Sequence, residues 1–146
     1  MTVFLRDYAL DASRLVKNQK IGEGGMGAVY AGTYDGKPVA IKTALAGVSD
    51  SEFQCEAASQ AQIPRHRSVV AFIGFVFSPP APASMMVAEL LVRGSLNTIL
   101  RGKNKEKMSL TRKLKIALDV AEGLEAIHLA NIIHSGTLPE PSPPPG

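Results

Sequence analysis

Short apolar segments rich in β-branched and aromatic residues fill most of the N-terminal part of the chain. Such segments are typical of strands that pack against a core. Five of them are predicted as strands, at residues 14–21, 27–34, 37–43, 69–77 and 85–91. Asp35-Gly36, a hairpin turn pair, separates the second strand from the third. The pattern therefore predicts a five-stranded antiparallel sheet.

A helix is predicted over residues 50–63, between the third and fourth strands. Ser49 or Asp50 is a favourable N-cap, and Glu52 lies in the first turn, where the helix dipole favours an anion. Pro64 stands where the apolar pattern ends, as is common after a helix. The apolar residues on one face of this helix form its predicted buried stripe: Phe53, Ala57 and Ala61.

The strongest helical periodicity lies at residues 110–129, after a short predicted helix at residues 96–100. One apolar face consists of Leu110, Leu114, Ala117, Leu118, Ala121, Leu124 and Ile127. Ile116 and Val120 add a second apolar face. We therefore expect this helix to need cover on more than one side, and no segment of this chain is expected to provide it.

Composition narrows the class of protein. The chain has 146 residues, of which 45% are hydrophobic, so we expect a folded domain. Its net charge of +3 is concentrated at residues 101–107 and 112–115, where no aromatic residue is interleaved. A solvated surface explains this charge better than a nucleic-acid site. Cys55 is the single cysteine, and no signal peptide or membrane span is recognisable, which favours the cytoplasm.

Three glycines follow the spacing G-x-G-x-x-G, at Gly22, Gly24 and Gly27. The spacing alone is a weak signal, since dinucleotide-binding loops share it and glycine hairpins are common. A dinucleotide loop opens a helix, however, and here strand-forming residues follow. The third strand then ends near Lys42. This order favours a loop whose backbone N–H groups approach the phosphates of a nucleotide.

These segments resemble the protein kinase family, whose G-x-G-x-x-G-x-V and V-A-I-K elements are both present, ending here at Val29 and Lys42. The resemblance implies an α+β fold. A kinase small lobe, with a five-stranded antiparallel sheet and one helix, is expected at residues 14–91. The start of the large lobe, with its first two helices, is expected at residues 92–134.

The remaining segments flank this partial kinase domain. Residues 1–13 are interpreted as a lead-in. Residues 135–146 are interpreted as a disordered tail, because the last eight residues hold half of the ten prolines.

The resemblance implies that ATP binds at the glycine loop and that Lys42 contacts its α- and β-phosphates. An acidic residue on the following helix holds this lysine in kinases, and Glu52 and Glu56 are the candidates. Counting back from His66, which matches the histidine that follows this helix in the family, selects Glu56. The other ATP-binding positions that the resemblance implies are Ile21, Gly22, Glu23, Gly24, Gly25, Met26, Gly27, Val29, Ala40, Glu89 and Leu91.

Residues 85–96 resemble the hinge between the two kinase lobes. Backbone groups of Glu89 and Leu91 are expected to bond the adenine edge, and apolar side chains are expected to contact its faces. Ala88 occupies the gatekeeper position at the back of the pocket and is unusually small. Residues 114–124 are similar to the tyrosine-kinase-like branch, which is mainly specific for serine and threonine.

The resemblance stops at the catalytic loop. His134 matches its histidine, but Gly136 stands where the family has the aspartate that orients the substrate hydroxyl. A whole kinase domain needs roughly 250 residues, and the magnesium ligands and activation loop have no counterpart here. We therefore expect no intact catalytic residue and no metal site, although Mg²⁺ accompanies ATP in the family. The resulting interpretation is a truncated kinase domain with an ATP-binding small lobe.

Two alternatives remain open. In the first, the chain is a non-catalytic interaction fragment whose helix at residues 110–129 docks on a full-length kinase or regulator. In the second, it is a full kinase whose recorded sequence changes reading frame or splice junction after His134. The expected partners are ATP and, through that helix, another protein. Neither nucleic acid nor a membrane is expected, and the protein substrate and pathway are left open.

Overall fold

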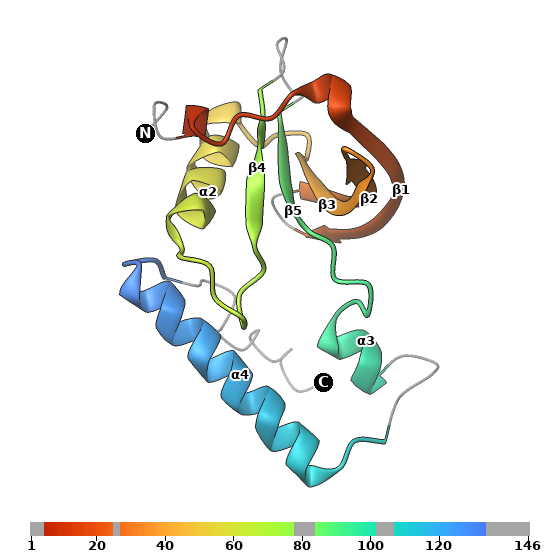
Figure 1. Ribbon diagram of the computed structural model, residues 1–146, viewed down its shortest axis with the longest axis vertical. Helices are drawn as coiled ribbons and strands as arrows, with labels where there is room; N and C mark the ends of the chain where they lie inside the picture. The colour runs from red at the N-terminus through yellow and green to blue at the C-terminus, as the bar shows by residue number, and fades with distance from the viewer. Residues whose placement is uncertain (1–4, 25–26, 78–83, 102–106, 134–146) are drawn as a thin grey trace, which may run out of the picture.

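The computed structural model describes residues 5–24, 27–77, 84–101 and 107–133. Its centre is a five-stranded antiparallel sheet with the strand order β1-β2-β3-β5-β4 (Figure 1). The strands are β1 (Leu15–Gly24), β2 (Gly27–Tyr34), β3 (Lys37–Ala44), β4 (Phe72–Val76) and β5 (Met85–Glu89). The helices are the 3₁₀ helix η1 (Ala12–Arg14) and the α-helices α2 (Asp50–Gln62), α3 (Leu96–Arg101) and α4 (Leu110–Leu129). The predicted fold class is confirmed.

The glycine-rich segment is more regular than the sequence indicated. β1 does not end at Ile21 but continues to Gly24, which pairs with Gly27 at the start of β2. The hairpin between β2 and β3 turns at Asp35 and Gly36, whose φ angles of 50° and 74° are both positive. Such a turn matches the twist of the flanking strands. The first three strands therefore form one continuous meander.

The last two strands are shorter than predicted. β4 begins at Phe72 rather than at residue 69, because the preceding residues form a turn in which the Val69 N–H donates to the His66 carbonyl at 3.1 Å. β5 ends at Glu89 rather than at residue 91. There the chain enters a turn in which the Gly94 N–H donates to the Leu91 carbonyl at 3.1 Å. Apolar residues alone did not reveal these turns.

Each face of the sheet has its own apolar core. The core on the α2 face contains Leu5, Phe53, Ala57, Ala58, Phe75 and Met86. The core on the opposite face contains Val39, Ile41 and Val87, with Leu10, Leu15, Tyr30, Tyr34, Ile73 and Met85 packed against it. Because side chains alternate along a strand, neighbouring residues of β3 and β5 serve different cores. The sheet is therefore packed on both sides.

α2 begins at a capping box, in which Ser49 and Glu52 each bond the other's backbone N–H. The Ser49 hydroxyl, and then its backbone N–H, lower the pKa of the Glu52 carboxyl below its ordinary value. Glu52 is therefore occupied at the helix start. The predicted stripe is confirmed, since the buried residues of α2 are Phe53, Ala57, Ala58 and Ala61.

The segment before η1 packs into the small lobe, a role that the sequence analysis did not assign to it. Leu5 is only 1% exposed and belongs to the core under α2. The Phe75 N–H donates to the Tyr8 carbonyl at 2.8 Å, and the Leu10 N–H donates to the Phe75 carbonyl at 2.9 Å. This segment therefore covers the outer edge of β4 and reaches beneath α2.

α4 crosses below the loop that joins α2 to β4, while α3 lies under β5 (Figure 1). Much of α4 is uncovered: Leu110, Leu114 and Leu118 are 71%, 62% and 56% exposed. Among the residues that the structure describes, the apolar face of α4 is therefore left largely exposed, as expected from its periodicity. Within those same residues, no helix combines the length and the apolar character needed to cross a membrane.

Candidate functional site

Strand register brings four of the predicted site residues to one face of the sheet. Val29 of β2 pairs with Lys42 of β3, and Ala40 of β3 pairs with Ala88 of β5. Directly paired residues share a face, as do residues two apart on one strand. Met86, which pairs with Lys42 from the other side, belongs to the core under α2. The four residues therefore lie on the face that α2 partly covers.

Lys42 and Glu56 form an ion pair between the Lys42 Nζ and the Glu56 Oε1. The two side chains are 22% and 25% exposed, so the pair lies largely between β3 and α2. Glu52, the other candidate, is engaged in the capping box one turn earlier. Partial burial removes water from the pair and strengthens its attraction relative to a surface pair. The structure thus joins the two residues that the sequence analysis matched.

Gly27 makes room for this lysine. A Cβ at Gly27 would lie 2.6 Å from the carbonyl oxygen of Thr43 and 2.8 Å from Cε of Lys42. Real Cβ atoms are not found this close to a backbone oxygen. The third glycine of the G-x-G-x-x-G pattern therefore lets the Lys42 stem lie flat across β2.

The first two glycines face open space instead. A Cβ at Gly22 or Gly24 would meet no atom within 4 Å. Glu23 pairs on the surface with Lys20, and the Ile21 side chain is half-exposed. Gly25 and Met26, also predicted site residues, lie outside the described residues. The packing of the protein itself therefore explains Gly27, whereas Gly22 and Gly24 leave clearance above the hairpin.

The predicted hinge residues have different backbone environments. The Glu89 N–H donates to the Ala71 carbonyl at 3.0 Å, and the Glu89 carboxylate accepts from the Ala71 N–H at 2.8 Å. The Leu91 carbonyl is used in the turn to Gly94, and the Leu91 side chain is exposed. Of the backbone groups predicted to meet a ligand, the Glu89 N–H is therefore already engaged. The Glu89 carbonyl and the Leu91 N–H are the groups left to consider.

A cavity of about 580 Å³ lies behind the ion pair, lined by Glu56, by residues of the loop after α2 and by Ile127 of α4. The second carboxylate oxygen of Glu56, Oε2, is buried and has no hydrogen-bond partner among the described residues. A buried acceptor of this kind usually has a donor nearby. Glu56 Oε2 is therefore the buried polar atom of the candidate site that lacks a contact among the described residues.

The expectations about metal ligands and the catalytic loop concern residues that the structure describes only in part. Across the described ranges, no group of three or more His, Cys, Asp or Glu side chains could hold a metal ion. His134 and Gly136, on which the expectation about the catalytic loop depends, are outside the described residues. The expectation about the catalytic loop therefore rests on the sequence alone.

A family model for protein tyrosine and serine/threonine kinases matches residues 15–136. The chain belongs to this protein kinase family. The match begins at the first residue of β1 and covers the sheet, α2, the hinge, α3 and α4. The resemblance stated from the glycine loop and Lys42 is thereby confirmed.

Similar kinases come from plants and animals. A probable leucine-rich repeat receptor-like protein kinase of Arabidopsis thaliana is 40% identical over 111 residues, which cover 74% of this chain and 11% of the relative. A serine/threonine-protein kinase of the same plant is 33% identical, with 88% and 22% covered. The megakaryocyte-associated tyrosine-protein kinase of Rattus norvegicus is 32% identical, with 87% and 26% covered. The chain thus spans between about a tenth and a quarter of the length of these kinases.

Two features of this kinase chain escaped the sequence analysis. Arg67 bonds two carboxylates of α4, and Gly123 allows α4 to approach the loop that carries Arg67. The sequence did contain a signal for the second feature, since a glycine in the middle of a strongly periodic helix usually has a packing reason. The position of Arg67 held no such signal, because its partners are more than fifty residues away.

Proposed function

We propose that this chain forms the nucleotide-binding part of a protein kinase domain and binds ATP through the glycine loop, Lys42 and the hinge. The observation that carries the proposal is the Lys42–Glu56 ion pair. It holds a cation on the same face of the sheet as the apolar residues Val29, Ala40 and Ala88. A fixed cation beside an apolar surface suits a ligand with phosphates at one end and a flat base at the other.

Each part of the site has a separate role in this proposal. The backbone of the glycine hairpin lies over the phosphates, where Gly22 and Gly24 offer clearance. Lys42 neutralises the α- and β-phosphates as a point charge. The Glu89 carbonyl and the Leu91 N–H bond the adenine edge, while Ile21, Val29, Ala40 and Leu91 contact its faces. Mg²⁺ supplies charge neutralisation in the family, and the described residues provide no cluster of ligands for it.

We also propose that the chain does not itself transfer phosphate. Phosphoryl transfer depends on positioning and electrostatics, and Gly136 offers no carboxylate where kinases orient the substrate hydroxyl. The similarity to the tyrosine-kinase-like branch implies that a complete kinase domain of this kind would transfer the ATP γ-phosphate to serine or threonine of a protein. A cytoplasmic location is proposed on the single cysteine and the apolar pattern.

Calorimetry with ATP, with and without Mg²⁺, tests the proposal. Wild type should bind weakly and with little metal dependence, and Lys42→Met should abolish binding. Lys37→Met is the matched control, because Lys37 is an exposed lysine on the same strand, β3. In a radiolabel assay, wild type should transfer no more phosphate to a generic protein substrate than Lys42→Met does. Equal binding by Lys42→Met and wild type would refute the proposed site.

A second candidate function is supported by α4. Its exposed leucines form an apolar strip that a folded protein rarely leaves open to water. In this candidate, the chain acts by docking the strip on another protein, and nucleotide plays no part. Absence of any ATP binding by wild type, together with self-association through α4, would favour it.

A further inference from the structure

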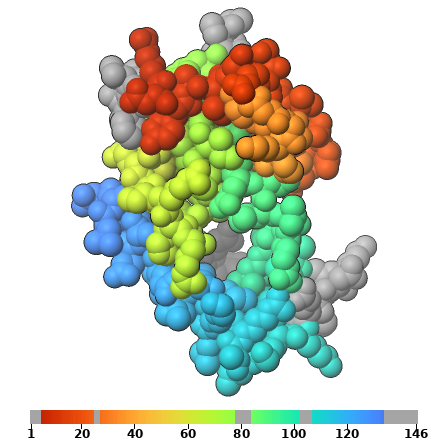
Figure 2. All heavy atoms as spheres, viewed as in Figure 1, coloured from red at the N-terminus to blue at the C-terminus, as the bar shows by residue number. Residues whose placement is uncertain are grey.

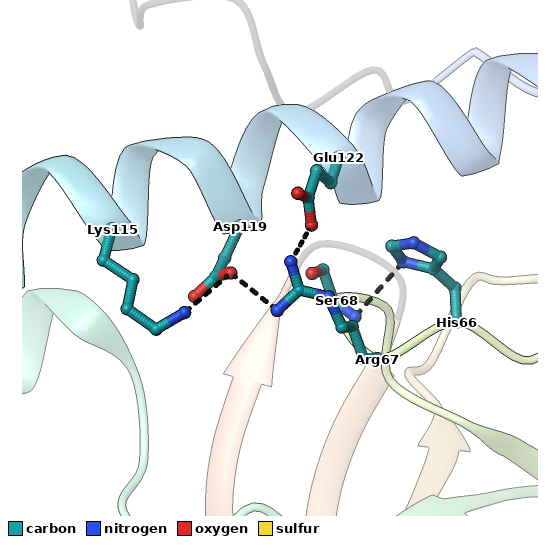
Figure 3. Close-up of polar contacts among 6 residues, drawn as sticks. All are labelled: His66, Arg67, Ser68, Lys115, Asp119 and Glu122. Carbon is teal, nitrogen blue, oxygen red and sulfur yellow. Dashed lines mark hydrogen bonds and ion pairs between the residues drawn. The ribbon is translucent and has the colours of Figure 1, made fainter.

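Arg67 lies in the loop between α2 and β4 and reaches across to α4. Its Nη1 lies 3.2 Å from Oδ1 of Asp119, and its Nη2 bonds Oε2 of Glu122. Figure 3 shows the guanidinium between the two carboxylates, which project from the same side of α4. Residues three apart on a helix are neighbours on its surface, so one planar guanidinium can bond both. We call these three residues the Arg67 fork.

Charge within the fork is balanced by a fourth residue. Nζ of Lys115, one turn earlier on α4, lies 3.7 Å from Oδ1 of Asp119 (Figure 3). Two cations therefore face two carboxylates, and Asp119 is shared between them. A network of this kind holds its geometry better than an isolated surface pair.

Close backbone packing accompanies the fork. Gly123 is the buried residue of α4, and a Cβ there would lie 2.6 Å from the carbonyl oxygen of Ser68. The Ser68 N–H in turn donates to Nδ1 of His66 at 3.2 Å, which fixes the shape of the loop around Arg67. In Figure 2 the yellow-green residues of this loop lie directly on the blue surface of α4. The loop thus contacts α4 in two ways, through the ion pairs of the fork and through the close approach at Gly123.

The same loop connects this contact to the candidate nucleotide site. Ser68 and Val69 line the cavity behind the ion pair together with Glu56. Ile127 of α4 and Ile132, which follows α4, line the same cavity. A shift of α4 away from the loop would therefore widen the cavity that Glu56 lines.

We propose that Arg67 is a positioning residue, which fixes α4 to the loop after α2 and thereby keeps Glu56 of α2 turned toward Lys42. Its effect on ligand affinity rests on the proposed ATP-binding function, whereas its effect on α2 does not. Arg67 itself is 59% exposed, and its two ion-pair partners lie on α4 and not on the strands that carry the candidate nucleotide site. Arg67 therefore acts on the Lys42–Glu56 pair only indirectly, through the loop after α2 and through α2 itself.

Hydrogen exchange on the whole chain, followed by mass spectrometry, tests the fork. Arg67→Ala should speed exchange of amides in both α2 and α4 by about two- to five-fold, the size of effect that exposed ion pairs supply. Arg65→Ala is the matched control, because Arg65 is an exposed arginine of the same loop, and it should leave both helices unchanged. Faster exchange in α4 alone would refute the link to α2, and no change in either helix would refute the fork.

Two further variants separate charge from packing. Arg67→Lys keeps the cation and should recover part of the protection of both helices. Gly123→Ala should loosen α4 even with Arg67 intact, because its Cβ would press on the Ser68 carbonyl. If Arg67→Lys behaves like Arg67→Ala in both helices, the planar guanidinium that bonds both carboxylates is what matters. If neither variant differs from wild type in either helix, the proposal fails.

Nucleotide affinity is measured on the same variants by calorimetry with ATP. Arg67→Ala should weaken binding by about two- to five-fold relative to Arg65→Ala, in step with the exchange of α2. If wild type binds no ATP, the proposed function fails, while the exchange of α2 still decides the role of Arg67. If α2 loosens and ATP affinity stays unchanged, the part of the proposal that concerns the nucleotide site is refuted.

Discussion

At the scale of single residues, the three glycines of the G-x-G-x-x-G pattern differ in what they do. The pattern treats them alike, since spacing carries no information on neighbours. The structure separates them by what a Cβ would meet: the Thr43 carbonyl and the Lys42 stem at Gly27, and no atom within 4 Å at Gly22 or Gly24. Gly27 is therefore required by the fold of the site, even with no ligand present.

This difference predicts opposite outcomes for two alanine substitutions. Gly27→Ala should destabilise the chain by roughly 1–3 kcal/mol, the usual cost of forcing a side chain into a packed region. It should also displace Lys42 from Glu56. Gly24→Ala should leave the free energy of unfolding within about 0.5 kcal/mol of wild type. Urea denaturation measures both, and equal stability of the two variants would contradict the role assigned to Gly27.

The pairing of Lys42 with Glu56 could be predicted from the sequence. The glycine spacing, the strand that follows it and the count back from His66 selected the same two residues that form the ion pair. Sequence did not indicate that the Glu89 N–H is engaged by Ala71, because that bond joins two residues 18 positions apart, beyond the reach of local pattern. Local pattern thus located side chains on strands better than it located backbone groups in loops.

At the scale of elements, α2 is held by more than the sheet. Its buried stripe, which the periodicity predicted, packs on Phe75 and Met86. The segment around Leu5 closes the same core from the side and extends the edge of β4 through bonds with Phe75. No periodic signal marks this segment, because a stretch of a few residues is too short for helical or strand periodicity to emerge. Since α2 carries Glu56, this segment supports the candidate site indirectly.

The N-terminal segment therefore yields a prediction for stability. Leu5→Ala should destabilise the chain by roughly 2–5 kcal/mol, because it leaves a cavity among fully buried side chains. Val16→Ala serves as the control, since Val16 is an apolar residue of β1 that is more than half exposed, and it should change stability by less than about 0.5 kcal/mol. Thermal unfolding followed by circular dichroism compares them. A Leu5→Ala variant as stable as the control would show that the segment does not contribute to the core.

At the scale of the whole molecule, the two ends of the fold differ in how well they are packed. The sheet has a core on both faces, whereas α4 contacts the small lobe mainly through the Arg67 fork, Gly123 and Ile127. Kinase relatives are four to nine times longer than the region that matches, and the family model extends to residue 136.

Sequence periodicity predicted α4 with its observed bounds, and it also predicted the excess of apolar surface. It could not predict where the helix docks, because that contact is made by charges far apart along the chain.

The exposed strip of α4 leads to the last prediction. Leu110, Leu114 and Leu118 lie at i, i+4 and i+8 on one side of the helix, and each is more than half exposed. Removing such a strip from water is favourable by roughly 25 cal/mol per Å² of apolar surface, so the isolated chain should self-associate. Replacing all three leucines with glutamine should shift size-exclusion chromatography toward the monomer.

The matched control replaces three exposed charged residues of the same helix, Arg112, Lys113 and Glu125, with glutamine. These changes leave the apolar strip intact, and the chain should still associate. The Arg67 fork makes the comparison informative, because it keeps α4 in place on the small lobe while the strip is altered. A wild-type chain that elutes as a monodisperse monomer at all concentrations would show that α4 tolerates water, and the docking function suggested for it would then lose its support.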